Sequence, residues 1–239
     1  MEWFAADLTS QLLRHERLLI AGAVVLLTAF SWAYVLRGIP MGIMQPPLAA
    51  LIIMWWVMML AMMLPSATPA ILLYARVRRN RPGNAAIAQP WVFLVGYLVA
   101  WLLFSIVAAF AQSLLAPPLM NVASRGAQGA VLIGAGLYQL SPLKSACVSQ
   151  CRSPAEFISR HWRPRWEGAV RLGLLHGAYC VGCCWLLMAL LFVGGVMNLL
   201  WVVALAVLVA IEKLTPRGLL LGRAAGVAMV LWGVFKAVA

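Results

Sequence analysis

Five cysteines are confined to one short stretch of this 239-residue chain. None occurs in the 146 residues before that stretch or in the 55 residues after it. They are Cys147, Cys151, Cys180, Cys183 and Cys184. Cysteine is often a small apolar core residue, so any one of them could be a buried filler. The confinement of all five to one region favours metal or redox chemistry instead.

The cysteines divide into two arms. The first arm is Cys147-x3-Cys151, and the second is His176-x3-Cys180-x2-Cys183-Cys184. On a helix, the residues of the second arm share an arc of about 100° over about 12 Å, and those of the first share one face. One helix cannot surround a tetrahedral ion, whereas two arms with such paired spacing can do so, as in structural zinc sites. Thiolate-rich sites favour Cu(I), so copper is the first candidate ion and zinc the second.

A methionine stripe is a candidate neighbour of these arms. Met54, Met58 and Met62 recur on one helical face. Such a stripe is usually adaptable packing. However, Met62 lies 14 residues before the basic residue Arg76, and Cys184 lies 13 residues after Arg171. If both arginines mark the same edge of a membrane, Met62 is level with the thiols and can add a thioether ligand.

Two other functions stay open from the same residues. Cys180 and Cys183 form a C-x-x-C, and their place in an apolar segment is similar to that in quinone-linked thiol oxidoreductases such as the vitamin K epoxide reductase family. Two points count against a role in oxidative folding. Cys184 is left over from the C-x-x-C, and the cysteines are expected on the cytoplasmic side of the membrane, where thiols stay reduced. The third function is a non-catalytic subunit or scaffold, in which a structural ion ties helices together. Proton-coupled transport is disfavoured because no carboxylate lies deep in an apolar segment.

The elements that must position these residues are apolar helices. Hydrophobic residues make up 64% of the chain, charged residues 10%, and the mean hydropathy is +0.94. A soluble domain has about a quarter of its residues charged, so lipid is the expected solvent. Runs close to the roughly 20 residues that cross a bilayer predict an all-α transmembrane bundle. We expect one membrane domain over 1–239 with about seven spans, near residues 18–36, 48–70, 91–114, 127–143, 169–192, 197–211 and 219–237.

The basic residues predict how these spans are oriented. With seven spans, 15 of the 18 Lys and Arg fall on one side of the membrane and 3 on the other. Cytoplasmic loops carry such an excess, so we expect the N-terminus inside and the C-terminus outside. Lipid headgroups and this orientation account for the net charge of +12, and a nucleic-acid partner is not expected.

Residues 143–170 form the one sizeable loop, which the charge pattern places on the inner side at the membrane interface. Ser153-Pro154-Ala155-Glu156 fits a capping box and predicts a short helix that begins there.

Small residues and a charged pair predict further contacts. The small residues are Gly134, Gly136 and the G-x-x-x-G formed by Gly173 and Gly177 around His176. Both sets predict the close approach of a neighbouring helix. Glu212 and Lys213 lie at the inner edge of a span, where we expect the two side chains to pair locally.

Several longer stretches resemble a bacterial family of integral membrane proteins described as predicted metal-binding proteins of unknown function. They are Met58-Met59-Leu60-Ala61-Met62-Met63-Leu64-Pro65, Gly136-Leu137-Tyr138-Gln139-Leu140-Ser141-Pro142-Leu143-Lys144, Cys147-Val148-Ser149-Gln150-Cys151-Arg152-Ser153-Pro154, Cys180-Val181-Gly182-Cys183-Cys184-Trp185, Gly195-Val196-Met197-Asn198 and Glu212-Lys213. The resemblance runs from about residue 50 to residue 218. It implies metal binding by the cysteines without naming the ion or a reaction.

We therefore expect a multi-pass protein of the bacterial inner membrane that binds copper or zinc at its cytoplasmic side. The candidate ligands are Cys147, Cys151, His176, Cys180, Cys183, Cys184 and Met62. The expected role is metal handling or metalloprotein assembly rather than catalysis. The expected partners are the lipid bilayer and a metalloprotein or another membrane subunit.

Overall fold

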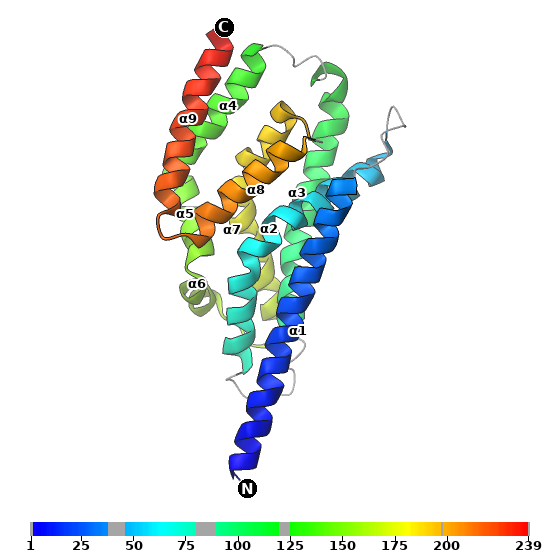
Figure 1. The fold of residues 1–239 in the computed structure, drawn as a ribbon, viewed down its shortest axis with the longest axis vertical. Coiled ribbons are helices and arrows are strands. Elements are labelled where there is room, and N and C mark those ends of the chain that lie inside the picture. Colours follow the sequence, from blue (N-terminus) through cyan, green and yellow to red (C-terminus); the bar gives the residue numbers. More distant parts are fainter. Residues whose placement is uncertain (1, 38–45, 80–88, 120–124, 197, 239) are drawn as a thin grey trace.

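The computed structural model describes residues 2–37, 46–79, 89–119, 125–196 and 198–238 (Figure 1). Its helices are α1 (Glu2–Arg37), α2 (Leu48–Arg79), α3 (Gln89–Leu119), α4 (Arg125–Leu140), α5 (Pro142–Arg152), α6 (Pro154–His161), α7 (Arg165–Gly194), α8 (Leu199–Leu214) and α9 (Gly218–Val238). Throughout these described ranges the regular structure is helical, without a strand. The predicted all-α class is therefore confirmed.

Five helices, and not seven, are both long and apolar enough to cross a membrane. The apolar segments are Leu18–Arg37, Leu48–Arg78, Pro90–Leu114, Arg165–Gly194 and Gly218–Val238, as counted over the described residues. The helices α4 and α8 have only 16 residues each. Each is about 24 Å long, whereas the hydrocarbon core of a bilayer is about 30 Å thick. The predicted number of spans was therefore too high, although each predicted segment overlaps a helix.

The chain breaks at Ser141, inside the predicted span 127–143. Ser141 has an extended backbone (φ −72°, ψ 149°), and Pro142 is the first residue of α5. The ring of Pro142 disfavours the helical conformation at the residue before it, which is Ser141. The helix α4 therefore ends at Leu140. The side chain of Ser141 then caps α5 by accepting a hydrogen bond from the backbone N–H of Lys144 (3.2 Å). The break lets α5 leave the axis of α4 as a separate helix.

The connection from α7 to α8 places the charged end of α8. Gly195 ends α7 with a positive φ of 91°, a conformation that glycine adopts without strain. The side chain of Asn198 then caps α8 by accepting from the N–H of Leu200 (3.2 Å). The helix continues to Leu214, three residues beyond the predicted end at 211. Glu212 and Lys213 therefore lie in the last turn of α8 rather than after it.

Glycines bring α4 against α9, which lie side by side in Figure 1. A Cβ atom at Gly136 would lie 2.6 Å from the carbonyl oxygen of Gly226, so a side chain has no room there. The predicted close packing is confirmed for Gly136. It is wrong for Gly134, because a Cβ atom there would meet nothing within 4 Å.

The G-x-x-x-G of α7 packs against α3, as predicted. A Cβ atom at Gly173 would collide with the carbonyl oxygen of Phe93, and one at Gly177 would lie 2.5 Å from the Cβ of Ala100. The close approach of α3 sets the rotation of α7 about its axis.

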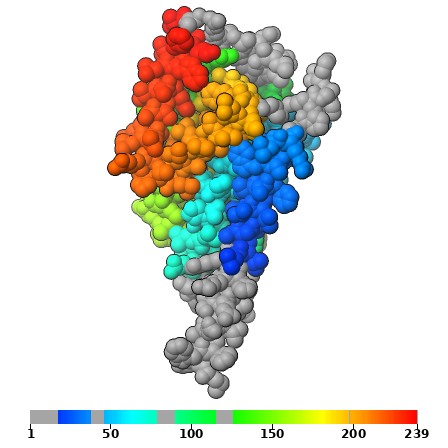
Figure 2. Space-filling model, in the orientation of Figure 1, coloured from blue at the N-terminus to red at the C-terminus, as the bar shows by residue number. Residues whose placement is uncertain are grey.

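Residues 143–170 contain α5, α6 and the first turns of α7. A helix does begin at Pro154, as predicted, but the side chain of Ser153 makes no capping hydrogen bond. Glu156 pairs instead with Arg160 one turn later (2.6 Å). In Figure 2, α8 and α9 share one face of the molecule with α1 and α2. The thiols of α7 are buried where α7 meets α5, α8 and the Met63 side chain of α2.

Candidate metal centre

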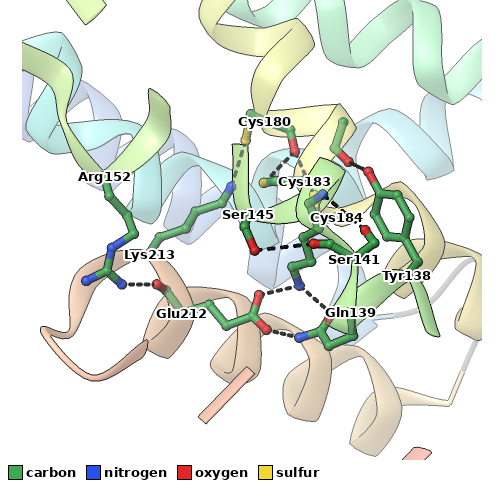
Figure 3. A network of polar contacts seen from close by, with 12 residues as sticks. Tyr138, Gln139, Ser141, Ser145, Arg152, Cys180, Cys183, Cys184, Glu212 and Lys213 are labelled. Atoms are coloured by element: carbon green, nitrogen blue, oxygen red, sulfur yellow. Dashed lines mark hydrogen bonds and ion pairs between the residues drawn. The ribbon is translucent and has the colours of Figure 1, made fainter. Parts of the chain in front are cut away.

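The thiol of Cys180 has a buried ammonium as its partner. The Nζ of Lys213 donates to the Sγ of Cys180 at 2.8 Å (Figure 3). The hydroxyl of Tyr97 lies 3.3 Å from the same sulfur. The exposed fractions are 1% for Cys180 and 7% for Lys213, so water is largely excluded from this contact. The helices α3, α7 and α8 meet at this one sulfur atom.

The two cysteines that follow point back along α7. The thiol of Cys183 donates to the carbonyl oxygen of Cys180 (3.0 Å), and the thiol of Cys184 donates to the same oxygen (2.9 Å). Such bonds to the preceding turn are common for short polar side chains in helices. The Sγ of Cys184 also lies 3.9 Å from the Sδ of Met63 on α2. Both thiols are 1% exposed.

The first cysteine arm lies on α5 and meets the second arm on α7. Cys151 is in side-chain hydrogen-bond contact with Cys180 and Cys183, and these contacts, together with burial, raise the pKa of the Cys151 thiol. Cys147 faces Gly182, where a Cβ atom would lie 3.2 Å from its sulfur. Burial raises the pKa of the Cys147 thiol as well. The structure thus brings together two arms that are separated by about 30 residues in the sequence.

The placed side chains do not surround a common point. Within the described parts of the chain, no group of three or more His, Cys, Asp or Glu side chains is arranged to hold a metal ion. The hydrogen bonds explain this arrangement, since two α7 thiols face their own backbone and Lys213 stands against Cys180. Rotation about χ1 is enough to redirect a thiol. The available donors, thiols and a thioether, are those that soft ions such as Cu(I) prefer.

Met63, rather than the predicted Met62, reaches the thiols. The Sδ of Met63 lies 3.9 Å from both the Sγ of Cys184 and the Nζ of Lys213. Met62 is also buried, at 2% exposed, but of the described methionines it is Met63 whose thioether contacts a cysteine. Helical periodicity alone does not separate two methionine-bearing faces of α2, because Met59 and Met63 have the same spacing as Met58 and Met62. The rotation of α2 decides between the two faces.

His176 points into aromatic rings instead of toward the thiols. Its ring centroid lies 5.2 Å from that of Phe157 and 5.9 Å from those of Phe93 and Tyr97. The imidazole is 2% exposed, and its Nδ1 has no hydrogen-bond partner among the described residues. The structure therefore places His176 one helical turn from Cys180 but not in a thiol contact.

A buried ionic network lies beside the thiols and corrects the predicted pairing of Glu212 with Lys213. Glu212 pairs instead with Lys144 of α5 (2.7 Å) and accepts a hydrogen bond from the amide of Gln139. The ammonium of Lys144 also donates to the amide oxygen of Gln139, and Arg152 donates to the backbone carbonyl of Glu212. Burial raises the pKa of the Glu212 carboxyl, and the ammonium of Lys144 opposes that shift.

Sequence reasoning missed Lys213, Tyr97 and Met63 as members of this site. Only Lys213 carried a usable signal, because a lysine that ends an apolar run must find either water or a partner. Tyr97 and Met63 lie within apolar runs, where nothing separates them from ordinary core residues.

Comparison with known proteins identifies one matching family. A family model described as PpoB2, copper chaperone, matches residues 52–236. The match covers 185 of the 239 residues and includes every candidate ligand. No curated protein and no solved structure matches the chain.

Proposed function

The chain belongs to the PpoB2 copper chaperone family, and we propose that it is a membrane-integral chaperone that binds Cu(I) through the thiols of α5 and α7. The observation that carries this proposal is the contact of the half-buried Cys151 on α5 with Cys180 and Cys183, which are buried on α7. Copper is the cargo of such a protein, so the site must both hold it and give it up.

The donor set supports copper over zinc. A thioether is a poor ligand for zinc but a good one for Cu(I), and Met63 lies within 3.9 Å of Cys184. We assign Cys180, Cys183 and Cys184 as ligands from α7, and Cys151 and Cys147 as ligands from α5. Met63 takes the place of Met62 in this assignment. His176 is held among aromatic rings, so we assign it to positioning α7 rather than to copper.

Ligand exchange is the chemistry that this site supports. A thiol that binds Cu(I) must first release its proton, because the thiolate is the ligand. Neighbouring thiols offer successive partners, so Cu(I) can be passed on with at least two Cu–S bonds kept during transfer. We propose that the acceptor is a copper-dependent metalloprotein, which takes the ion by presenting its own soft ligands.

We propose that the protein spans the bacterial inner membrane with the thiols toward the cytoplasm. Five helices have the length and apolarity to cross. Six arginines lie before the first crossing segment or at and beyond the end of the second, against Arg37 alone between the two segments, and this excess supports an N-terminus inside. The short helix α4 and the following α5 run in succession in Figure 1, so we propose that together they return the chain to the inner side. Cytoplasmic thiols stay reduced and available as ligands.

Anaerobic purification with elemental analysis and thiol counting tests the proposal. Full-length protein is loaded with Cu(I) and compared with a variant in which Cys180, Cys183 and Cys184 are all Ser. We expect bound copper in the wild type and its loss in the variant. Circular dichroism and size-exclusion chromatography must show that the variant is still folded. A full copper complement in a folded variant would reject these ligands.

The contact of Cys180 with Lys213 also favours a second candidate, a thiol–disulfide enzyme. An adjacent ammonium stabilises a thiolate, which is the attacking form in disulfide exchange. Cys183, three residues later, would be the partner in a C-x-x-C. Trapping of a mixed disulfide by Cys183→Ser would support this reading, whereas copper bound to free thiols would support the chaperone.

A further inference from the structure

Lys213 is a buried lysine whose ammonium meets sulfur atoms. It lies in the last turn of α8 and is 7% exposed. Its Nζ lies 2.8 Å from the Sγ of Cys180 and 3.9 Å from the Sδ of Met63. The long side chain thus carries a full positive charge from α8 into the space between the thiols of α7 and the thioether of α2.

No carboxylate forms an ion pair with Lys213 in the described parts of the chain. The ion pairs there join Lys144 to Glu212 and Arg160 to Glu156. Glu212 precedes Lys213 but is taken by Lys144 and Gln139. A buried cation without an anionic partner is very costly. The contacts of the ammonium there are instead the sulfur atoms of Cys180 and Met63.

The surrounding contacts hold Lys213 in this position. Successive helical residues differ by about 100° in direction, so Glu212 faces α5 while Lys213 faces α7. The Lys144–Glu212 pair fixes the rotation of the last turn of α8. Arg152 donates to the carbonyl oxygens of Glu212 and Pro216, on either side of Lys213. The ammonium is thus a fixed feature of the thiol site.

We propose that Lys213 makes the thiol site selective for a monovalent ion over a divalent one. This inference rests on the proposed binding of Cu(I) at these thiols. A fixed positive charge repels a divalent ion twice as strongly as a monovalent ion at the same place. The comparison is made for the two ions bound at the same place by the same thiolates, so that only the charge of the ion differs.

The expected size of the effect is large enough to measure. For unit charges about 4–6 Å apart at an effective dielectric constant of about 20, the extra repulsion corresponds to about a hundredfold to a thousandfold in affinity. Lys213 therefore disfavours Zn(II) relative to Cu(I) by about this factor. When the two ions bind the same thiolates, any effect of the ammonium on thiol deprotonation is shared by them and cancels in the ratio of their affinities.

Competition with chelators of known affinity, under anaerobic conditions, gives the Cu(I)-to-Zn(II) affinity ratio of the full-length protein. Lys213→Met and Lys213→Gln remove the charge, and Lys213→Arg keeps it. Lys236→Met is the matched control, since Lys236 lies in the last turn of α9, whereas the thiols lie on α5 and α7. We expect the ratio to fall by about a hundredfold or more in the two neutral variants and to stay at the wild-type value in Lys213→Arg and Lys236→Met.

The outcomes separate this inference from the proposed function. Absence of Cu(I) binding in the wild type would reject the proposed function, and this inference with it. Cu(I) binding in the wild type, with an unchanged ratio in a folded neutral variant, would reject the inference alone. If neither neutral variant folds, Lys213→Arg decides the question. A wild-type affinity ratio in Lys213→Arg would support a role for the positive charge, and loss of that ratio would contradict it.

Discussion

Two buried lysines lie close together in this protein but meet different chemistry. Lys144 faces a carboxylate and an amide, and this neutral network ties α5 to α4 and α8. Lys213 faces a thiol and a thioether. Lys144 has a carboxylate partner, as a structural role requires. Lys213 lies beside the proposed copper ligands, so its positive charge affects which ion the site prefers.

At the residue scale, Met63→Leu tests which methionine serves the site. Leucine keeps the volume but removes the sulfur, so we expect the affinity for Cu(I) to fall about tenfold or more. Met62→Leu is the matched control, since its thioether makes no described contact with a thiol, and its affinity should stay within about twofold. Competition with a coloured Cu(I) chelator measures both variants. An equal loss in the two variants would argue that methionine content matters rather than position.

At the element scale, the Lys144–Glu212 pair is the main polar tie between α5 and α8. Both side chains are nearly inaccessible, at 5% and 4% exposed, so loss of one partner leaves a buried charge unpaired. We expect Lys144→Met to lower the free energy of unfolding by about 3–5 kcal/mol.

Combining Lys144→Met with Glu212→Leu removes both charges, and we expect it to restore most of the lost stability. Reversible unfolding in mixed micelles measures the double-mutant cycle. Strictly additive costs would mean that the two side chains do not act as a pair.

Two glycines on α4 offer a second test at the element scale. Gly136→Ala places a methyl group against the carbonyl of Gly226, and we expect a loss of about 1–3 kcal/mol in stability. Gly134→Ala meets open space, so helix propensity alone should leave stability unchanged or raise it by up to about 1 kcal/mol. Unfolding midpoints in the same detergent compare the variants. Equal effects at the two positions would contradict the α4–α9 contact.

At the scale of the whole molecule, the side chains of the protein itself join α5 to α7 through thiol and apolar contacts, and α5 to α8 through an ion pair. We therefore expect removal of Cu(I) by a chelator to leave the helical circular dichroism signal unchanged. The melting temperature should fall by only the amount that ligand linkage gives at the Cu(I) concentration used. Loss of helical signal on chelation would instead identify a structural ion and favour the scaffold reading.

Much of the fold followed from local pattern. Apolar runs located every helix that could cross a membrane, and the spacing of Gly173 and Gly177 predicted the contact with α3. The number of crossings did not follow in the same way. A break of one residue at Ser141 shortens α4 below the needed length, although the hydropathy of the segment stays high.

The cysteine arms were likewise readable, because residues three or four apart on a helix share a face whatever surrounds them. Their two-arm arrangement, with Cys151 beside Cys180, agrees with that reading. The sequence did not predict which further side chains contact the cysteines. That depends on how α2 and α8 rotate and slide against α7, and many distant residues set this packing together. Tertiary structure therefore decided that Met63 contacts Cys184 and that His176 enters an aromatic cluster. It also decided that Glu212 pairs with Lys144 while Lys213 contacts Cys180.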